Sequence, residues 1–307
     1  MIRFVNAKIN IGLQVVRRRE DGYHDLQTVF YPVGLYAGTP RNPEPFCDVI
    51  EVTRLHGGRD ARFSLKLRGE ELDCGLENNL VNRAAELFFE NCEDPDFRVE
   101  ITLEKHLPTG AGMGGGSADA AFTLKMLGEI CSSFPSENRT IRQRDRQFES
   151  SKMMEETALR LGADCPFFLL NKAAYATGVG EILYPIELDL SGKWLLVIKP
   201  DVFISTKEAF AGITPKEADF DLRDICSLPV SEWRDFVKND FEDSIFPRYP
   251  FLSGIKEKLY LTGAEYASLT GSGSCLYGIF SDKAKAEEAR ESFRGSATIS
   301  ASYLLLL

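Results

Sequence analysis

The glycine-rich segment LPTGAGMGGGSADAA, residues 107–121, constrains the fold more than any other part of the chain. Five of the seven residues from Gly110 to Gly116 are glycine, and residues 117–130 are rich in the helix formers Ala, Leu and Met. Glycine permits positive φ and a close approach of ligand to backbone, so successive N–H groups can converge on an anion at a helix N-terminus. The pattern predicts a phosphate-binding loop that opens a helix. The alternative is a simple turn in which Ser117, followed by Asp119, acts as an ordinary N-cap.

Three familiar phosphate loops do not match this segment. A Walker A loop requires lysine after its second conserved glycine, whereas Gly116 follows Gly115 here. The spacing Gly110-x-Gly112-x-x-Gly115 satisfies the dinucleotide fingerprint, but residues 131–152 lack the second strand and acid expected about twenty residues later. The protein-kinase loop requires V-A-I-K and H-R-D motifs, which the sequence does not contain. A cation for the phosphates must therefore come from elsewhere in the chain or from a metal.

Composition narrows the class of protein further. The 307 residues suffice for two domains or one large domain, and the 44% hydrophobic content is typical of a globular chain. The net charge of −10 disfavours a general nucleic-acid or anionic-membrane surface. The seven cysteines are scattered without a CxxC pair, which indicates reduced and mostly buried thiols. With neither a signal-peptide pattern nor a long apolar run, we expect a soluble cytoplasmic protein.

The N-terminal residues predict a hairpin that presents polar groups. Residues 4–16 alternate, with isoleucines and leucine on one face and Lys8, Asn10 and Gly12 on the other, and a turn at 17–22 leads into a strand at 23–33. A lysine on a strand is commonly solvated, but small neighbours on this face leave room for a ligand. We therefore expect Lys8 and Asn10 to project side by side next to the turn that carries Tyr23 and His24.

The remaining pattern is that of an α+β protein. Asp164 lies in a turn of small residues, where an acid is commonly an Asx-turn or a cap, although a buried acid that faces a phosphate would be catalytic. Gly178 and Gly180 predict a hairpin turn. Residues 37–46 are expected to form a loop and 131–152 an exposed excursion, for which a basic patch is the functional alternative. Strands are predicted at 48–55, 62–67, 97–103, 194–199, 266–270 and 275–280, with a second glycine loop at 271–274. Helices are predicted at 80–91, 153–161, 206–211 and 283–293, and at 233–237 and 241–261 around a break at Pro247–Pro250.

Several of these segments together resemble the GHMP kinases. Lys8-Ile9-Asn10, the loop at 108–121 and Gly271-Ser272-Gly273-Ser274 are similar to the three motifs of that family. The segments REDGYH (19–24), LGADCP (161–166) and GVGE (178–181) resemble a branch whose acceptor alcohol carries a cytidine diphosphate. The resemblance covers nearly the whole chain. Residues 131–152 and 296–307 depart from the family pattern, which affects loop conformation and oligomer contacts more than chemistry.

The resemblance implies an α+β, two-domain kinase. It implies a ribosomal-protein-S5-like N-terminal domain over residues 1–160 that binds ATP and a ferredoxin-like C-terminal domain over 161–307. Lys8 and Asp164 correspond to the catalytic pair of the family, and Ser117 is the candidate Mg²⁺ contact. The residues expected to surround the ATP phosphates are Pro108, Thr109, Gly110, Ala111, Gly112, Met113, Gly114, Gly115, Gly116, Ser117 and Ala118.

The same resemblance implies a substrate pocket. His24 would hydrogen-bond the cytosine edge while Tyr23 and Phe210 stack on the faces of the base. Asn10 would hold the acceptor or its diphosphate, with Thr206 a weaker candidate. Gly271, Ser272 and Gly273 would approach the substrate phosphates. Considered alone, Tyr23 and Phe210 are typical core aromatics and the second glycine loop is typical of a tight turn. His56 and His106 lack metal-ligand spacing.

Other functions stay open at this stage. They are a mevalonate or homoserine kinase, a catalytically inactive relative that binds nucleotide as an interaction module, and an NAD-binding oxidoreductase. The Tyr23-His24 pair favours a nucleotide-bearing acceptor, and the presence of both Lys8 and Asp164 favours an enzyme. We expect a small-molecule substrate, no nucleic-acid or membrane partner, and a monomer or homodimer.

Overall fold

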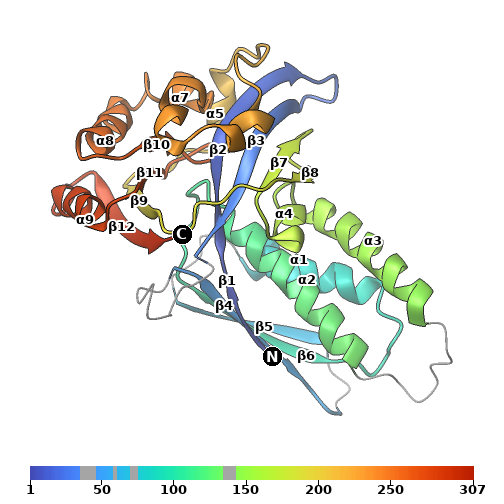
Figure 1. Cartoon of the computed structure of the whole chain (residues 1–307). Coiled ribbons are helices and arrows are strands. Elements are labelled where there is room, and N and C mark those ends of the chain that lie inside the picture. Colours follow the sequence, from blue (N-terminus) through green and yellow to red (C-terminus); the bar gives the residue numbers. More distant parts are fainter. Residues whose placement is uncertain (35–45, 58–60, 70–74, 134–142) are drawn as a thin grey trace. The chain divides into compact units, whose positions relative to one another are not determined.

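The chain folds into two compact units built from interleaved segments (Figure 1). The computed structural model describes residues 1–34, 46–57, 61–69, 75–133 and 143–307. Unit 1 comprises Met1–Asn6, Cys47–Thr109 and Gly114–Asn171, and unit 2 comprises Ala7–Phe46, Gly110–Met113 and Lys172–Leu307. The division into 1–160 and 161–307 stays a prediction of where the two domains of the family meet.

Unit 1 is built on a four-stranded sheet of order β1-β4-β6-β5. The strands β1 (Ile2–Val5), β4 (Asp48–Arg54) and β6 (Val99–Lys105) pair antiparallel, and β5 (Phe63–Gly69) pairs parallel to β6. Along β6 every second residue from Val99 to Lys105 is buried, as the alternating sequence VEITLEK predicts. This alternation places one face of the sheet against the helices of the same unit.

The helices of unit 1 pack on one another and on this sheet. They are α1 (Leu80–Glu90), α2 (Gly115–Ser133), α3 (Gln143–Leu161) and α4 (Cys165–Leu170), with a 3₁₀ turn at Leu76–Asn78. Helices α1, α2 and α3 lie side by side (Figure 1). The side chain of Asn79 caps α1 by accepting a hydrogen bond from the Val81 amide at 2.9 Å. Ala84, Leu124 and Leu161 belong to the buried cluster between these helices.

Three local predictions for this unit are wrong. The strand expected over 4–16 is interrupted at Asn6, so β1 and β2 belong to different sheets. Helix α2 begins at Gly115, which makes Ser117 a first-turn residue rather than the N-cap. Residues 131–133 complete α2, and α3 begins at Gln143, ten residues before the expected start at 153. Its early turns are rich in Gln, Arg and Glu, which are good helix formers even where hydrophobic periodicity is weak.

Two predicted segments, the excursion at 131–152 and the loop at 37–46, lie partly outside the described residues. Residues 134–142 of the expected excursion lie outside the described part of the chain. Apart from Phe46, so does the loop expected at 37–46.

The first sheet of unit 2 contains the predicted hairpin. Its order is β2-β3-β7-β8, with β2 (Ala7–Arg18), β3 (His24–Val33), β7 (Ala174–Thr177) and β8 (Ile182–Pro185) all antiparallel. The predicted turn at Gly178 and Gly180 joins β7 to β8. Every residue of β2 from Ala7 to Val15 is buried, so the face that carries Lys8 is not solvated.

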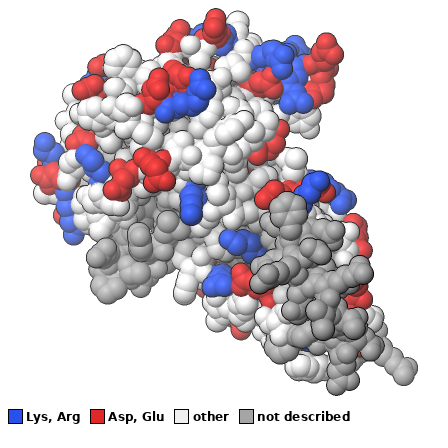
Figure 2. Space-filling view, turned by 45° about the vertical axis from the view of Figure 1, so that its right-hand side comes forward, with Lys and Arg blue, Asp and Glu red and all other residues white. Residues whose placement is uncertain are grey.

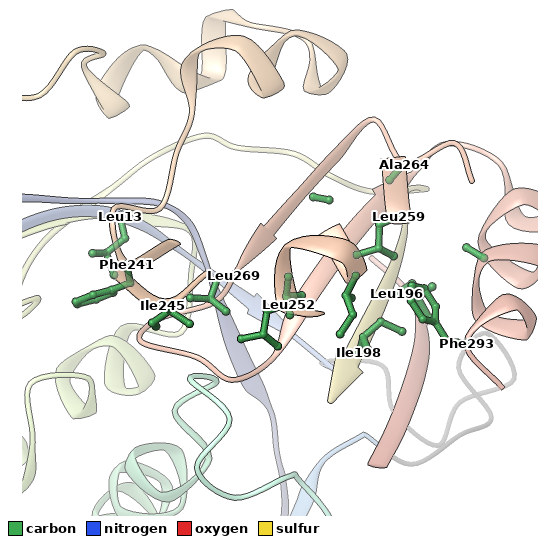
Figure 3. Close-up of a cluster of buried hydrophobic side chains, with 14 of the residues drawn as sticks. Leu13, Leu196, Ile198, Phe241, Ile245, Leu252, Leu259, Ala264, Leu269 and Phe293 are labelled. Carbon is green, nitrogen blue, oxygen red and sulfur yellow. The ribbon is translucent and has the colours of Figure 1, made fainter. Parts of the chain in front are cut away.

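The second sheet of unit 2 has the order β10-β11-β9-β12 and is antiparallel throughout. Its strands are β9 (Trp194–Pro200), β10 (Tyr266–Leu269), β11 (Leu276–Phe280) and β12 (Ile299–Leu306), and strand β12 had no counterpart among the predicted elements. The helices of the unit are α5 (Thr206–Ala211), α6 (Trp233–Phe236), α7 (Phe241–Ile245), α8 (Pro250–Leu261) and α9 (Lys283–Ser292), with 3₁₀ turns at Leu222–Ser227 and Val230–Glu232. Figure 3 shows the apolar core of this region, in which Leu196 and Ile198 of β9 lie near Leu259 of α8, while Phe241 and Ile245 of α7 lie near Leu13.

The surface adds two observations. On the face shown in Figure 2, basic and acidic side chains are interspersed. In the part of the chain that the structure describes, none of the helices has the length and apolar character required to cross a membrane.

Candidate active site

The first half of the glycine loop is held against the second glycine loop within unit 2. Gly112 has φ +73°, and an ideal Cβ there would lie 2.1 Å from the Thr270 carbonyl oxygen, so only glycine fits. Thr270 Oγ1 donates to the Gly112 carbonyl at 3.2 Å, and the Cys275 amide donates to the Ala111 carbonyl at 3.3 Å. The two glycine-rich motifs, far apart in sequence, are therefore neighbours in the fold.

Lys8 supplies a cation at this loop. Its side chain is 3% exposed, and Nζ donates to Asn10 Oδ1 at 2.5 Å and to the Gly112 carbonyl at 3.1 Å. The Lys8 amide donates to the Met113 carbonyl at 3.0 Å, and Nζ lies 5.0 Å from the centroid of the Phe30 ring. Lys8 and Asn10 project side by side as expected, but the expectation that they lie next to the turn of Tyr23 and His24 is wrong. They pair with Pro32 and Phe30, toward the end of the β2–β3 hairpin away from that turn. Strand β2 thus places a lysine cation at this loop.

Asn10 is fixed from several directions. Its Nδ2 donates to Thr28 Oγ1 at 3.0 Å, and its backbone amide donates to Thr270 Oγ1 at 3.1 Å. The Tyr277 hydroxyl donates to the Asn10 carbonyl at 2.8 Å. Because Asn10 Oδ1 accepts from Lys8, this network also fixes the direction of the ammonium group.

The second half of the loop forms the start of α2 in unit 1. The first-turn amides of a helix have no intrahelical acceptor, and with the helix dipole they form an anion site. Ser117 lies in this turn and is half-buried, with its hydroxyl beside the Cys165 thiol. An ideal Cβ on Gly162 would lie 3.8 Å from Ser117 Oγ, which places the turn before α4 next to the first turn of α2.

Asp164 lies in that turn. The residue is half-buried and directly precedes α4, but its side chain accepts no capping hydrogen bond from the helix. The alternative prediction, that this acid serves as a helix cap, is therefore wrong. Unit 1 brings Asp164 and Ser117 into one region, whereas Lys8 belongs to unit 2, so the pairing of Lys8 with Asp164 stays a prediction.

A buried charge cluster beneath the start of α2 was not predicted. Lys105 Nζ donates to Asp119 Oδ2 at 2.8 Å and also to Asp48, whose Oδ1 accepts the amides of His106 at 2.6 Å and Leu107 at 2.8 Å. Burial, only partly offset by Lys105, raises the pKa of Asp119. An ideal Cβ on Gly115 would lie 3.6 Å from Lys105 Nζ. Asp48, Lys105 and Asp119 lie in separate segments of the sequence, and only the fold joins them.

The residues predicted to bind a base lie in unit 2. The rings of His24 and Phe210 stack with centroids 4.6 Å apart and planes 15° apart. Burial, followed by the nearby Arg18, lowers the pKa of His24, which favours neutral imidazole. Tyr23 is 65% exposed, so the alternative that it is a core aromatic is wrong. Thr206 is also exposed, with its hydroxyl 3.4 Å from that of Ser272 in the second glycine loop.

Comparison with known proteins decides the family. Family models described as "GHMP kinases N terminal domain" and "GHMP kinases C terminal" match residues 79–172 and 223–297. A 4-diphosphocytidyl-2-C-methyl-D-erythritol kinase of Bacteroides fragilis is 44% identical over 285 residues, 93% of this chain and 94% of the relative. The chain belongs to this family of GHMP kinases. It is therefore a small-molecule kinase that uses ATP, and its α+β GHMP kinase fold is confirmed.

Two further relatives support this placement. The Bacteroides thetaiotaomicron kinase of the same name is 45% identical to this GHMP kinase over 91% of the chain and 92% of the relative. A crystal structure of 4-(cytidine 5'-diphospho)-2C-methyl-D-erythritol kinase superposes with a TM-score of 0.75 at 31% identity, covering 99% of both chains. A mevalonate kinase of Methanococcus jannaschii, at 13% identity and a TM-score of 0.62, shares the fold.

Proposed function

We propose that this GHMP kinase transfers the γ-phosphoryl group of ATP to the 2-hydroxyl of 4-diphosphocytidyl-2-C-methyl-D-erythritol. In this reaction the hydroxyl oxygen forms a bond to the γ-phosphorus, the bond to the β-phosphate oxygen breaks, and ADP leaves. The observation that carries the proposal is the buried Lys8 ammonium, which Asn10 and the Gly112 carbonyl hold against the glycine loop. A desolvated cation fixed in this way stabilises charge on a transferring phosphoryl group.

The glycine loop and the start of α2 would hold the ATP phosphates. The positive φ values of Gly110, Gly112 and Gly114 allow peptide N–H groups to turn toward an anion, and the dipole of α2 adds to the attraction. The absence of side chains at these positions leaves room for the phosphate chain. Most of the catalytic effect would arise from this positioning, because phosphoryl transfer requires little covalent assistance from protein.

Asp164 would receive the proton of the attacking hydroxyl. Its carboxylate does not cap α4, and its turn lies next to Ser117 in the first turn of α2. A carboxylate in hydrogen-bond reach of the substrate hydroxyl can accept its proton, an effect worth about 10²–10⁴ in rate. Lys8 would neutralise charge on the transferred phosphoryl group.

The cytidine group would bind at His24, Tyr23 and Phe210. His24 stacks on Phe210 with 4.6 Å between centroids, so this aromatic face already suits a flat ring. In our proposal the cytosine replaces His24 on Phe210, Tyr23 covers the opposite face of the base, and His24 turns to hydrogen-bond its edge. The lowered pKa of His24 supports this role, because neutral imidazole both donates and accepts hydrogen bonds.

Magnesium fits as a partner of the nucleotide. Mg²⁺ commonly takes one or two protein oxygens together with substrate phosphates. Ser117 offers a hydroxyl in the first turn of α2, with the turn of Asp164 beside it. Among the described residues no group of three or more His, Cys, Asp or Glu could hold a metal by itself, a pattern compatible with binding together with ATP. When bound, the ion would neutralise phosphate charge.

We also propose that the enzyme works in the cytoplasm, where ATP is made and cysteines stay reduced.

The test is an ADP-release assay with Mg²⁺–ATP and three acceptors. We expect turnover with 4-diphosphocytidyl-2-C-methyl-D-erythritol and none above background with mevalonate or homoserine. Lys8→Met should abolish turnover, whereas Lys66→Met, a surface lysine 56% exposed, should not change it. Comparable turnover of mevalonate or homoserine would overturn the proposed acceptor. ATP binding without turnover of any acceptor would favour the interaction-module alternative.

A further inference from the structure

Two cysteines of unit 1 lie within contact of each other. Cys92 follows α1, and Cys131 lies in the last turn of α2, 39 residues later. Their Sγ atoms are 3.9 Å apart, and both side chains are half-buried, so small reagents can approach them. A disulfide requires about 2.05 Å between the sulfurs, so rotation of the side chains must close roughly 1.9 Å.

Arg62 places positive charge beside Cys92. Its guanidinium group donates to the Cys92 carbonyl at 3.3 Å from both terminal nitrogens and to the Asp94 carbonyl at 2.5 Å. A hydrogen bond with Cys131 is the main cause that lowers the pKa of Cys92, and the charge of Arg62 adds to it. Thiolate, the nucleophilic form, is thereby favoured at one member of the pair.

The other described cysteines lack this combination. Cys47, Cys165 and Cys275 are buried, and burial raises their thiol pKa values to about 11, 12 and 12. Cys226 is exposed as a residue, but its thiol is partly desolvated, which raises its pKa. Proximity and a stabilised thiolate therefore coincide only at Cys92 and Cys131 among the described cysteines.

We propose that Cys92 and Cys131 form a redox-active dithiol that hydrogen peroxide converts to an intramolecular disulfide. The Cys92 thiolate attacks one peroxide oxygen, which gives a sulfenic acid and, after protonation, water. The Cys131 sulfur then attacks the Cys92 sulfur, the S–S bond forms, and the sulfenic oxygen leaves as a second water. Two thiols lose two electrons in total and the peroxide gains them.

The cross-link would close the segment that carries β6, the glycine loop and most of α2. A covalent tie across this loop restricts the unfolded chain and so stabilises the folded unit. Oxidation would therefore raise the temperature at which unit 1 unfolds, by about 5 °C or more. A thiol reductant would reverse the shift.

The test treats the reduced full-length protein with hydrogen peroxide. We expect the intact mass to fall by about 2 Da, peptide mapping to recover the 92–131 cross-link, and thiols to fall from the seven of the sequence to five. Cys92→Ser and Cys131→Ser should each abolish the cross-link and the thermal shift, while Cys226→Ser keeps both.

Two results would overturn the proposal. One is loss of thiols without a 92–131 cross-link, for example through a disulfide between two chains at Cys226. The other is an unchanged rate and pattern of oxidation in Cys92→Ser. Neither readout depends on kinase activity, so the test is independent of the proposed function.

Discussion

Replacing Lys105 by methionine should lower the stability of unit 1 more than the same replacement of a surface lysine. The Lys105 side chain is 4% exposed and lies between Asp48 and Asp119, which are 0% and 3% exposed. Methionine preserves most of the volume but leaves both carboxylates without their cation. Asp48 keeps the amides of His106 and Leu107, whereas no donor in the described structure reaches Asp119 Oδ1. Most of the cost should therefore fall on Asp119.

The magnitude follows from the loss of one partner of a buried ion pair. Such a loss costs about 3–5 kcal/mol, because the remaining charge stays desolvated. For a unit of this size that corresponds to a drop of roughly 10 °C in Tm. Adding Asp119→Asn to Lys105→Met removes the stranded charge and should restore about half of the loss.

Thermal and urea unfolding of the purified variants provide the measurement. The matched control is Lys66→Met on the neighbouring strand β5, whose ion pair with Glu100 spans 2.7 Å with side chains 56% and 34% exposed. Pairs of this kind contribute about 0–1 kcal/mol. A Lys105→Met protein that unfolds like Lys66→Met would refute the reasoning, as would a double variant no more stable than the single one.

Four further outcomes are expected. Asp164→Asn should retain ATP binding by titration but lower turnover about 10²–10⁴-fold, and near-normal turnover would remove Asp164 from its proposed role. Tyr23→Ala should raise the KM for the cytidylated substrate, and an effect confined to the KM for ATP would contradict the proposed stacking. Gly112→Ala should cost more stability and activity than Gly57→Ala. Both glycines have positive φ, but only at Gly112 would the added Cβ lie within 4 Å of backbone atoms; equal losses would argue against the close contact. Alkylation of Cys92 should slow about tenfold from pH 7 to pH 5, as its thiol, with a pKa lowered to about 6, takes up a proton, and a rate that still rises toward pH 9 would show an ordinary thiol.

Much of the site could be predicted because its signals are local. A run of glycines before a helix-forming segment predicts a loop that opens a helix, and α2 begins within that run. Period-two alternation placed Lys8 beside Asn10, and the structure joins them by a hydrogen bond of 2.5 Å. Gly178 and Gly180 marked a hairpin turn because their positive φ values suit a tight reversal of the chain.

Other features depend on partners that are distant in sequence, and local patterns do not contain them. The break at Asn6 reflects a change of sheet, since β1 pairs with β4 whereas β2 pairs with β3. Strand β12 forms through antiparallel pairing with the edge of β9. The turn of Asp164 gains its place next to Ser117 only through the packing of α4 against α2.

The sequence alone therefore determined the loop, the hairpin and the family, because each rests on neighbouring residues or on a recognisable order of motifs. The tertiary structure decided which charges and thiols meet. Hydrogen bonds of the Lys105 cluster span up to 59 positions of the sequence, and the two thiols lie 39 positions apart. Burial makes these contacts important for stability, because the removal of water strengthens the attraction between paired charges and destabilises unpaired ones. At Cys92 and Cys131, proximity and a stabilised thiolate together support the proposed redox pair.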